Sequence, residues 1–128
     1  ISVLEIKSQL IAAKNNLKDI KDVIDKASAA IEKQPSKLHS DALRMSLVES
    51  IIEFDSGSAE KVFNEINSPQ KGQLIAAQKR LNARWWTMKS ILNPSMAIVA
   101  LREAISLNKA TGCHHAAKQL TARLHKLL

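Results

Sequence analysis

Aromatic residues, glycine, proline and cysteine are all scarce in this chain of 128 residues. There is no tyrosine, the aromatic side chains are two Phe and two Trp, and Gly and Pro occur three times each. β-Strands favour aromatic and β-branched residues, whereas this sequence is dominated by residues such as Ala, Leu, Ile and Lys. The composition therefore predicts an all-α protein, and the length is that of a single domain, 1–128.

The single cysteine, Cys113, cannot form an internal disulfide. A chain without disulfides needs no oxidising compartment, so we expect a reducing, cytoplasmic location. No apolar run reaches the roughly 18–20 uncharged residues that span a bilayer. We therefore also expect a soluble protein without a transmembrane segment.

The motifs of the common enzyme classes are absent from the sequence. It contains no Gly-rich phosphate loop, no HExxH or GxSxG motif and no paired CxxC. Asp19, Asp22 and Asp25 alternate with lysines at spacings that form i,i+4 ion pairs on a solvated helix face. We therefore expect no catalytic residues, no cofactor and no enzymatic activity.

Cys113 is followed by His114 and His115, which are residue types that bind metals. Consecutive residues of a helix point about 100° apart, so these three side chains cannot converge on one ion. His125 is too far along the same segment to complete a site, and we predict no metal. Cys113 is either a reactive thiol or, as we favour, a small half-buried residue after the Gly112 turn.

The first 34 residues have the most regular apolar pattern in the chain. Spacings of three and four alternate, as in a coiled-coil seam, at Val3, Ile6, Leu10, Ala13, Leu17, Ile20, Ile24, Ala27 and Ile31. The pattern predicts one helix of about 30 residues that ends near Gln34, because Pro35 disfavours helical geometry in the residue before it. We expect the seam to be buried in the bundle; the alternative is a homo-oligomer through this first helix.

Cap and turn signals divide the remaining chain into five further helices. They are expected at about 40–55, stopped by a left-handed Gly57; at 59–66, capped by Ser58; from Ser68 and Pro69 to Leu92; from Asn93 and Pro94 to Gly112; and at 113–128. In the last helix one apolar stripe comprises Ala117, Leu120, Leu124 and Leu127. The sequence thus predicts a single bundle of about six helices.

The pentapeptide QLIAA occurs at Gln9–Ala13 and again at Gln73–Ala77, 64 residues later. At that offset, apolar positions of the first helix fall on apolar positions of the later segment. We infer an internal repeat of two related three-helix halves, 1–67 and 68–128, in a pseudo-twofold arrangement. The alternative is convergence on common helix-forming residues.

Positive charge is concentrated in the second half of the chain. Residues 1–64 contain nine Lys and Arg against ten Asp and Glu, whereas residues 65–128 contain ten against two. The candidate binding face comprises Lys79, Arg80, Arg84, Trp86, Lys89, Lys118, Arg123 and Lys126. Trp85 falls close to the apolar seam of Leu81 and Met88 and is expected in the core, while Trp86 is expected either between the two halves or against a partner.

Two functions fit these residues. The leading prediction is a non-enzymatic interaction or adaptor module whose basic C-terminal half docks a protein partner with an acidic surface. The alternative is nucleic-acid binding, in which the same basic face contacts DNA or RNA phosphates and the rings stack on bases. No recognised nucleic-acid motif frames these residues, which places the protein partner first.

Overall fold

The computed structural model describes residues 3–13 and 16–128. In these residues the structure has seven α-helices, one 3₁₀-helix and no strand, and the predicted all-α class is confirmed. The chain divides into two compact units, unit 1 (Ile1–Asn67) and unit 2 (Ser68–Leu128).

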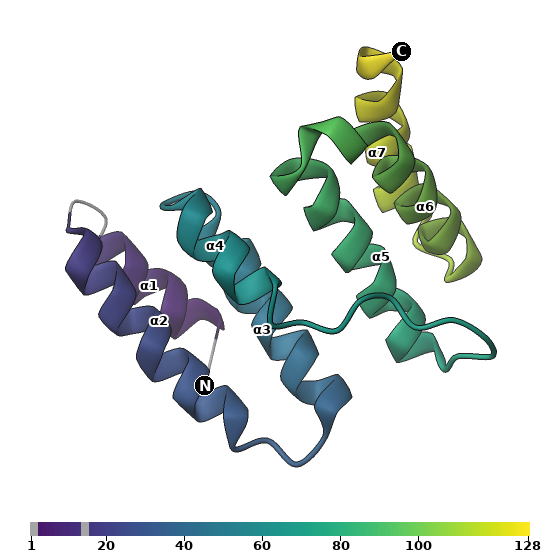
Figure 1. Ribbon diagram of the computed structural model, residues 1–128. Helices are drawn as coiled ribbons and strands as arrows, with labels where there is room; N and C mark the ends of the chain where they lie inside the picture. The colour runs from purple at the N-terminus through teal and green to yellow at the C-terminus, as the bar shows by residue number, and fades with distance from the viewer. Residues whose placement is uncertain (1–2, 14–15) are drawn as a thin grey trace. The chain divides into compact units, whose positions relative to one another are not determined.

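The two units differ in their helices (Figure 1). Among the described residues, unit 1 contains α1 (Val3–Ala13), α2 (Leu17–Glu32), α3 (Lys37–Ile51) and α4 (Ser56–Phe63). Unit 2 contains α5 (Ala76–Leu92), the 3₁₀-helix η1 (Pro94–Met96), α6 (Ala97–Ala110) and α7 (His114–Leu127). In the described part of the chain, unit 1 has four α-helices and unit 2 has three, so the predicted pair of related three-helix halves is not confirmed.

The predicted long first helix is wrong, because α1 ends at Ala13 and α2 begins at Leu17. Asn16 has extended backbone geometry, and its side-chain oxygen accepts hydrogen bonds from the backbone N–H groups of Lys18 (3.1 Å) and Asp19 (3.4 Å). This N-cap satisfies two donors that a new helix start would otherwise leave unbonded. Figure 1 shows α1 and α2 side by side, and α1 also packs against α3.

The apolar seam is nevertheless buried in both helices. Its buried members are Ile6, Leu10 and Ala13 of α1 and Ile20, Ile24, Ala27 and Ile31 of α2. The side chains of Val3 and Leu17 lie outside the described part. Leu4 and Ile11, which are apolar residues of α1 outside the seam, are 79% and 55% exposed. The seam therefore identifies the inward faces of two short helices.

The connection between α3 and α4 lies earlier in the chain than the sequence predicted, because α3 ends at Ile51 and α4 begins at Ser56. Two backbone N–H groups, of Phe54 and Asp55, donate to the carbonyl of Ile51 and close the end of α3. Asp55 is the N-cap residue of α4, and the hydroxyl of Ser58 donates to its carboxylate. Gly57 lies inside α4, so its expected role as a left-handed helix stop is wrong.

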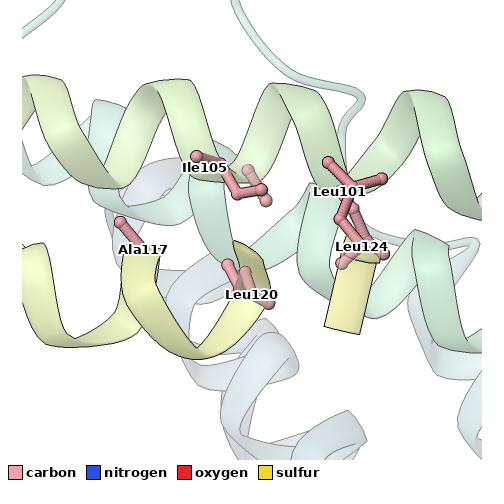
Figure 2. Packing of buried hydrophobic residues seen from close by; sticks show 6 residues of the cluster. Leu101, Ile105, Ala117, Leu120 and Leu124 are labelled. Carbon is pink, nitrogen blue, oxygen red and sulfur yellow. The ribbon is translucent and has the colours of Figure 1, made fainter. Parts of the chain in front are cut away.

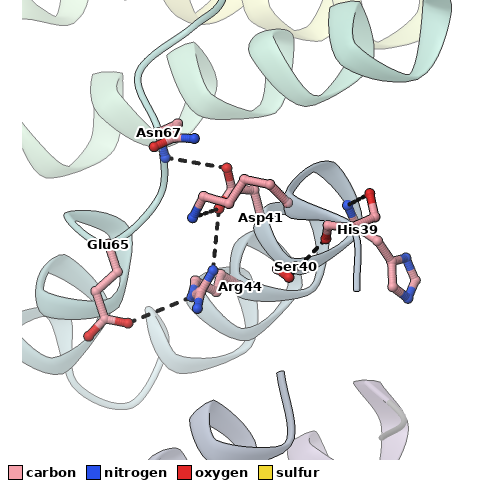
Figure 3. Close-up of polar contacts among 8 residues, drawn as sticks. His39, Ser40, Asp41, Arg44, Glu65 and Asn67 are labelled. Carbon is pink, nitrogen blue, oxygen red and sulfur yellow. Dashed lines mark hydrogen bonds and ion pairs between the residues drawn. The ribbon is translucent and has the colours of Figure 1, made fainter. Parts of the chain in front are cut away.

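A buried carboxylate joins α3 to the end of unit 1 (Figure 3). Asp41 is 4% exposed, and its oxygens lie 2.9 Å from the Lys37 ammonium and 3.4 Å from the Arg44 guanidinium. The same carboxylate accepts a hydrogen bond from the backbone N–H of Asn67 (3.4 Å). Arg44 in turn pairs with Glu65 at 3.8 Å. These contacts hold the chain after α4 against α3.

Unit 2 has a packed interface between α6 and α7 (Figure 2). Its buried side chains are Leu101, Ala104 and Ile105 of α6 and Ala117, Leu120 and Leu124 of α7. The predicted stripe of the last helix is thus confirmed except at Leu127, which is 50% exposed. Gly112 has a φ of +77° and separates the two helices, as expected for a residue that tolerates the left-handed region.

The predicted helix start at Ser68 and Pro69 is wrong. Residues 68–75 are not helical, and α5 begins at Ala76, with the Ile75 carbonyl accepting from the N–H groups of Gln78 and Lys79. The first QLIAA copy is therefore entirely within α1, whereas in the second only the two alanines are helical. The same five letters form different structures in the two units.

Candidate docking pocket

The segment before α5 is held in place by one buried side chain. Asn82 is 3% exposed, and its Oδ1 accepts a hydrogen bond from the backbone N–H of Gln70 (3.4 Å) while its Nδ2 donates to the Gln70 carbonyl (3.0 Å). Gln78 also donates to Asn82 Oδ1, at 2.9 Å. A buried amide that is satisfied in this way fixes the neighbouring backbone. The segment from Ser68 to Leu74 therefore has a defined position beside α5.

Gly72 allows the 68–74 segment to turn. Its φ is +99°, which side-chain-bearing residues rarely adopt, and no atom lies within 4 Å of the position a Cβ would take. The requirement for glycine is therefore conformational rather than steric. Together with the Asn82 hydrogen bonds, the turn explains why a segment with helix-start signals does not continue into α5.

A pocket of about 560 Å³ lies among the 68–74 segment, α5 and α6. Its apolar lining includes Leu74, Trp85, Trp86 and Leu107, and its charged lining consists of Lys71, Lys79 and Glu103. The volume is within the range of pockets that hold small ligands or side chains of a partner. All of these residues belong to unit 2.

The two tryptophans form an edge-to-face pair in the pocket lining. Their ring centroids are 5.0 Å apart, with an angle of 85° between the ring planes. The Lys89 ammonium lies 5.7 Å from the Trp85 ring centroid, within cation–π range. Trp86 packs against the α6–α7 core while remaining partly exposed. Both rings are thus held in position by neighbours within unit 2.

The predicted basic face is distributed over several surfaces of unit 2. Lys79 and Trp86 line the pocket, and Lys89 lies against Trp85. Arg123 donates to the Ser90 hydroxyl at 3.3 Å, which joins α7 to α5. The remaining predicted residues are Arg80, Lys118 and Lys126, which are exposed, and Arg84, which is half-buried. At 100° per residue, Lys79 and Arg84 point about 140° apart on α5.

Most pocket residues were not identified as site residues from the sequence, among them Lys71, Leu74, Glu103 and Leu107. Lys71 and Leu74 lie in the segment that was expected to be helical. Glu103 and Leu107 lie four residues apart on α6 and share one face of that helix. The tryptophans are on a different helix, and no motif includes Glu103 or Leu107. The pair Lys71 and Gly72 was the available signal, because glycine commonly interrupts a helix.

Cys113, His114 and His115 lie at the start of α7. No group of three or more metal-ligating residues comes together in the described part of the chain. Cys113 is half-buried, and its backbone N–H donates to the carbonyl of Asn108 at 2.8 Å. This placement agrees with the interpretation of Cys113 as a small residue that follows the Gly112 turn.

The charge difference between the units is larger than the division into equal halves suggested. Unit 2 contains ten Lys and Arg and one acidic residue, Glu103, whereas unit 1 contains nine Lys and Arg and eleven Asp and Glu. The formal charges are therefore +9 and −2, which add to the +7 of the chain. The pocket lies in the strongly basic unit.

Comparisons with known proteins identify no relative. No protein-family model matches the chain, and neither the curated proteins nor the solved structures contain a match. Among the described residues, none of the helices has the length and apolar character needed to cross a membrane.

Proposed function

We propose that this chain is a non-enzymatic helical interaction module whose basic unit 2 docks an acidic segment of a protein partner. The observation that supports it is the pocket, where Lys71 and Lys79 border tryptophan and leucine side chains. Cations attract carboxylates, and an apolar pocket lining adds contact area that makes an interface specific. The charge of +9 on unit 2 increases the rate at which an acidic partner is encountered.

Nucleic acid is the second candidate, and the arrangement of the rings favours it less. Stacking on bases requires an open ring face. Trp85 is contacted by the Trp86 ring and the Lys89 ammonium, while Trp86 packs against the α6–α7 core. The rings therefore resemble pocket walls more than a stacking platform.

Titration of the whole chain with three labelled probes tests the proposal. The probes are a blocked oligoglutamate peptide, a short DNA duplex and a short single-stranded RNA, measured by fluorescence anisotropy between about 50 and about 200 mM salt. The double variant Lys71→Glu/Lys79→Glu reverses the charge at the pocket. The control Lys18→Glu/Lys21→Glu makes the same charge change on the exposed side of α2 in unit 1.

We expect oligoglutamate to bind the wild type and the α2 control with similar affinity. The pocket variant should bind it at least about tenfold more weakly, because two attractive charges become repulsive. If either nucleic acid binds more tightly than oligoglutamate, with a salt slope near 0.9 for each phosphate contacted, the second candidate replaces the first. If no probe binds at low salt, both candidates are wrong.

A further inference from the structure

The pocket of unit 2 is lined by charges of both signs, which come from different elements. Lys71 comes from the 68–74 segment and Lys79 from the first turn of α5, whereas Glu103 comes from α6. Glu103 is the single acidic residue of the unit, so the one carboxylate available lies at this pocket. A ligand with carboxylates all around its apolar part would place some of them against Glu103, which is unfavourable.

The same pocket also has an apolar lining. Leu74 and Leu107 face the pocket together with the edge-to-face tryptophan pair. Because the rings are supported by the α6–α7 core and by Lys89, little side-chain order has to be gained on binding. A large apolar side chain from a partner would be buried there at little entropic cost.

We propose that the pocket binds a short partner segment in which one large apolar anchor residue has carboxylates on one side only. The anchor occupies the space between Trp86, Leu74 and Leu107, the carboxylates face Lys71 and Lys79, and the other flank, near Glu103, is neutral or basic. This inference rests on the proposed acidic protein partner. It adds a polarity to that proposal, because the partner's carboxylates lie on one side of its apolar anchor only.

The Asn82 hydrogen bonds give the charged side of the pocket its position. They fix the backbone at Gln70, the residue directly before Lys71. The 68–74 segment is consequently held before a ligand arrives, and both Lys71 and Leu74 depend on it. Preorganisation of this kind increases affinity because less conformational entropy is lost on binding.

Blocked peptides of identical composition test the polarity. Each contains one Leu and the same number of Glu, and the Glu residues are placed all before the Leu, all after it, or evenly on both sides. Three matching control peptides have Ser in place of Leu. Binding is followed by intrinsic tryptophan fluorescence, because both tryptophans of the chain line the pocket. Non-specific attraction to unit 2 would not distinguish the three charge arrangements.

We expect one of the one-sided peptides to bind best. It should exceed the two-sided peptide by about two- to fivefold, which is the effect of a single exposed charge contact. It should exceed its own Ser version by about tenfold, because the Ser version lacks the buried apolar side chain. Glu103→Gln should remove the preference by improving the two-sided peptide.

Paired variants locate the site. Leu74→Ala should weaken the best peptide, whereas Ile75→Ala, at an exposed neighbouring position that does not line the pocket, should not. Lys79→Gln should likewise weaken binding, while Lys109→Gln, at an exposed position of α6 that does not line the pocket, should leave it unchanged. Trp86 is not used as a test, because its loss would disturb the core of unit 2.

The outcomes separate the two proposals. If the Leu and Ser peptides bind equally well, or if Glu103→Gln leaves the ranking unchanged, the polarised pocket is wrong while acidic docking by unit 2 stands. If none of the acidic peptides binds, acidic docking fails as well. If the peptides do not bind but a single-stranded RNA changes the tryptophan fluorescence, the pocket binds a nucleic-acid base, and both protein-based proposals are overturned.

Discussion

Units 1 and 2 each hold an irregular segment against a helix through one buried polar side chain, but they use different chemistry. In unit 1, Asp41 accepts from the backbone of Asn67 and is surrounded by Lys37 and Arg44. In unit 2, Asn82 makes hydrogen bonds in both directions with the backbone of Gln70. A buried carboxylate needs cations nearby, whereas a buried amide needs only a donor and an acceptor.

This difference agrees with the charges of the two units. In unit 1, cations and carboxylates are nearly balanced, and Lys37 and Arg44 pair with the buried Asp41. In unit 2, one carboxylate cannot neutralise ten cations, and the buried contact is made without charge. Unit 2 thus has an excess of positive charge that its own residues do not compensate.

The largest expected effect is that of Asn82→Asp, which gives unit 2 the acidic group that unit 1 uses. The carboxylate would be buried next to the Gln70 carbonyl, where Asn82 makes its hydrogen bonds with uncharged groups, at an expected cost of about 3–5 kcal/mol. The cost should decrease at acidic pH, because a protonated carboxyl can donate to that carbonyl. Urea unfolding followed by fluorescence at neutral and acidic pH measures both effects.

The control for this change is Asn93→Asp. The side-chain oxygen of Asn93 accepts from the Ser95 hydroxyl in an exposed turn, and a carboxylate can do the same. Its effect should stay within about 0.5 kcal/mol. An equally small and pH-independent loss at position 82 would show that the neutral contact does not hold unit 2 together.

Truncation of core leucines compares the two cores directly. Leu10→Ala in unit 1 and Leu101→Ala in unit 2 remove nearly fully buried side chains, and each should cost about 2–5 kcal/mol. Exposed Ile11→Ala and Val99→Ala are the matched controls and should change little. Circular dichroism monitors all helices, whereas tryptophan fluorescence monitors unit 2 alone, because both tryptophans are there. A fluorescence transition that moves equally in Leu10→Ala would show that the units unfold together.

Asp41→Asn is the converse of the change in unit 2 and should have a smaller effect. The amide oxygen can still accept from Asn67, but Lys37 and Arg44 lose their carboxylate partner. We expect a loss of about 1–3 kcal/mol in urea unfolding followed by circular dichroism. Lys37→Gln, which removes only the exposed partner, should cost less. A neutral or stabilising result for Asp41→Asn would show that unit 1 does not require the charge.

The smallest expected effect is that of Asn16→Ala. It removes the side chain that accepts from two backbone N–H groups at the start of α2, and such caps contribute about 1 kcal/mol. Asn16→Asp keeps the acceptor and should retain the stability. Thermal unfolding by circular dichroism distinguishes the two variants. If both variants were equally stable, the Asn16 cap would not contribute, and packing alone would determine where the chain breaks between α1 and α2.

The break between α1 and α2 shows what periodicity can predict. The seam from Ile6 to Ile31 correctly identified the buried residues, but not the chain reversal between them. An apolar spacing of three and four is the same whether one helix continues or two helices each present their inner face. A cap of about 1 kcal/mol and the packing of α1 on α3 decide between these structures, and neither is visible in the spacing.

The pocket was predictable only in part, for a similar reason. Lys79 and Trp86 were recognised because basic and aromatic residues are adjacent in the sequence. Lys71 was assigned to a helix, since Ser68 and Pro69 have the character of a helix start. Asn82, twelve residues after Gln70, holds that segment in a different conformation, and a contact over this distance leaves no local pattern.

The all-α class, the inward faces of most helices, the turn at Gly112 and the basic character of the C-terminal part were predictable, because they follow from composition and from short-range spacing. The end of α1, the start of α5 and the charged residues that border the tryptophan pair were not predictable. They depend in part on contacts between residues that are distant in the chain. Their small energies choose between backbone conformations that local preferences leave nearly equal.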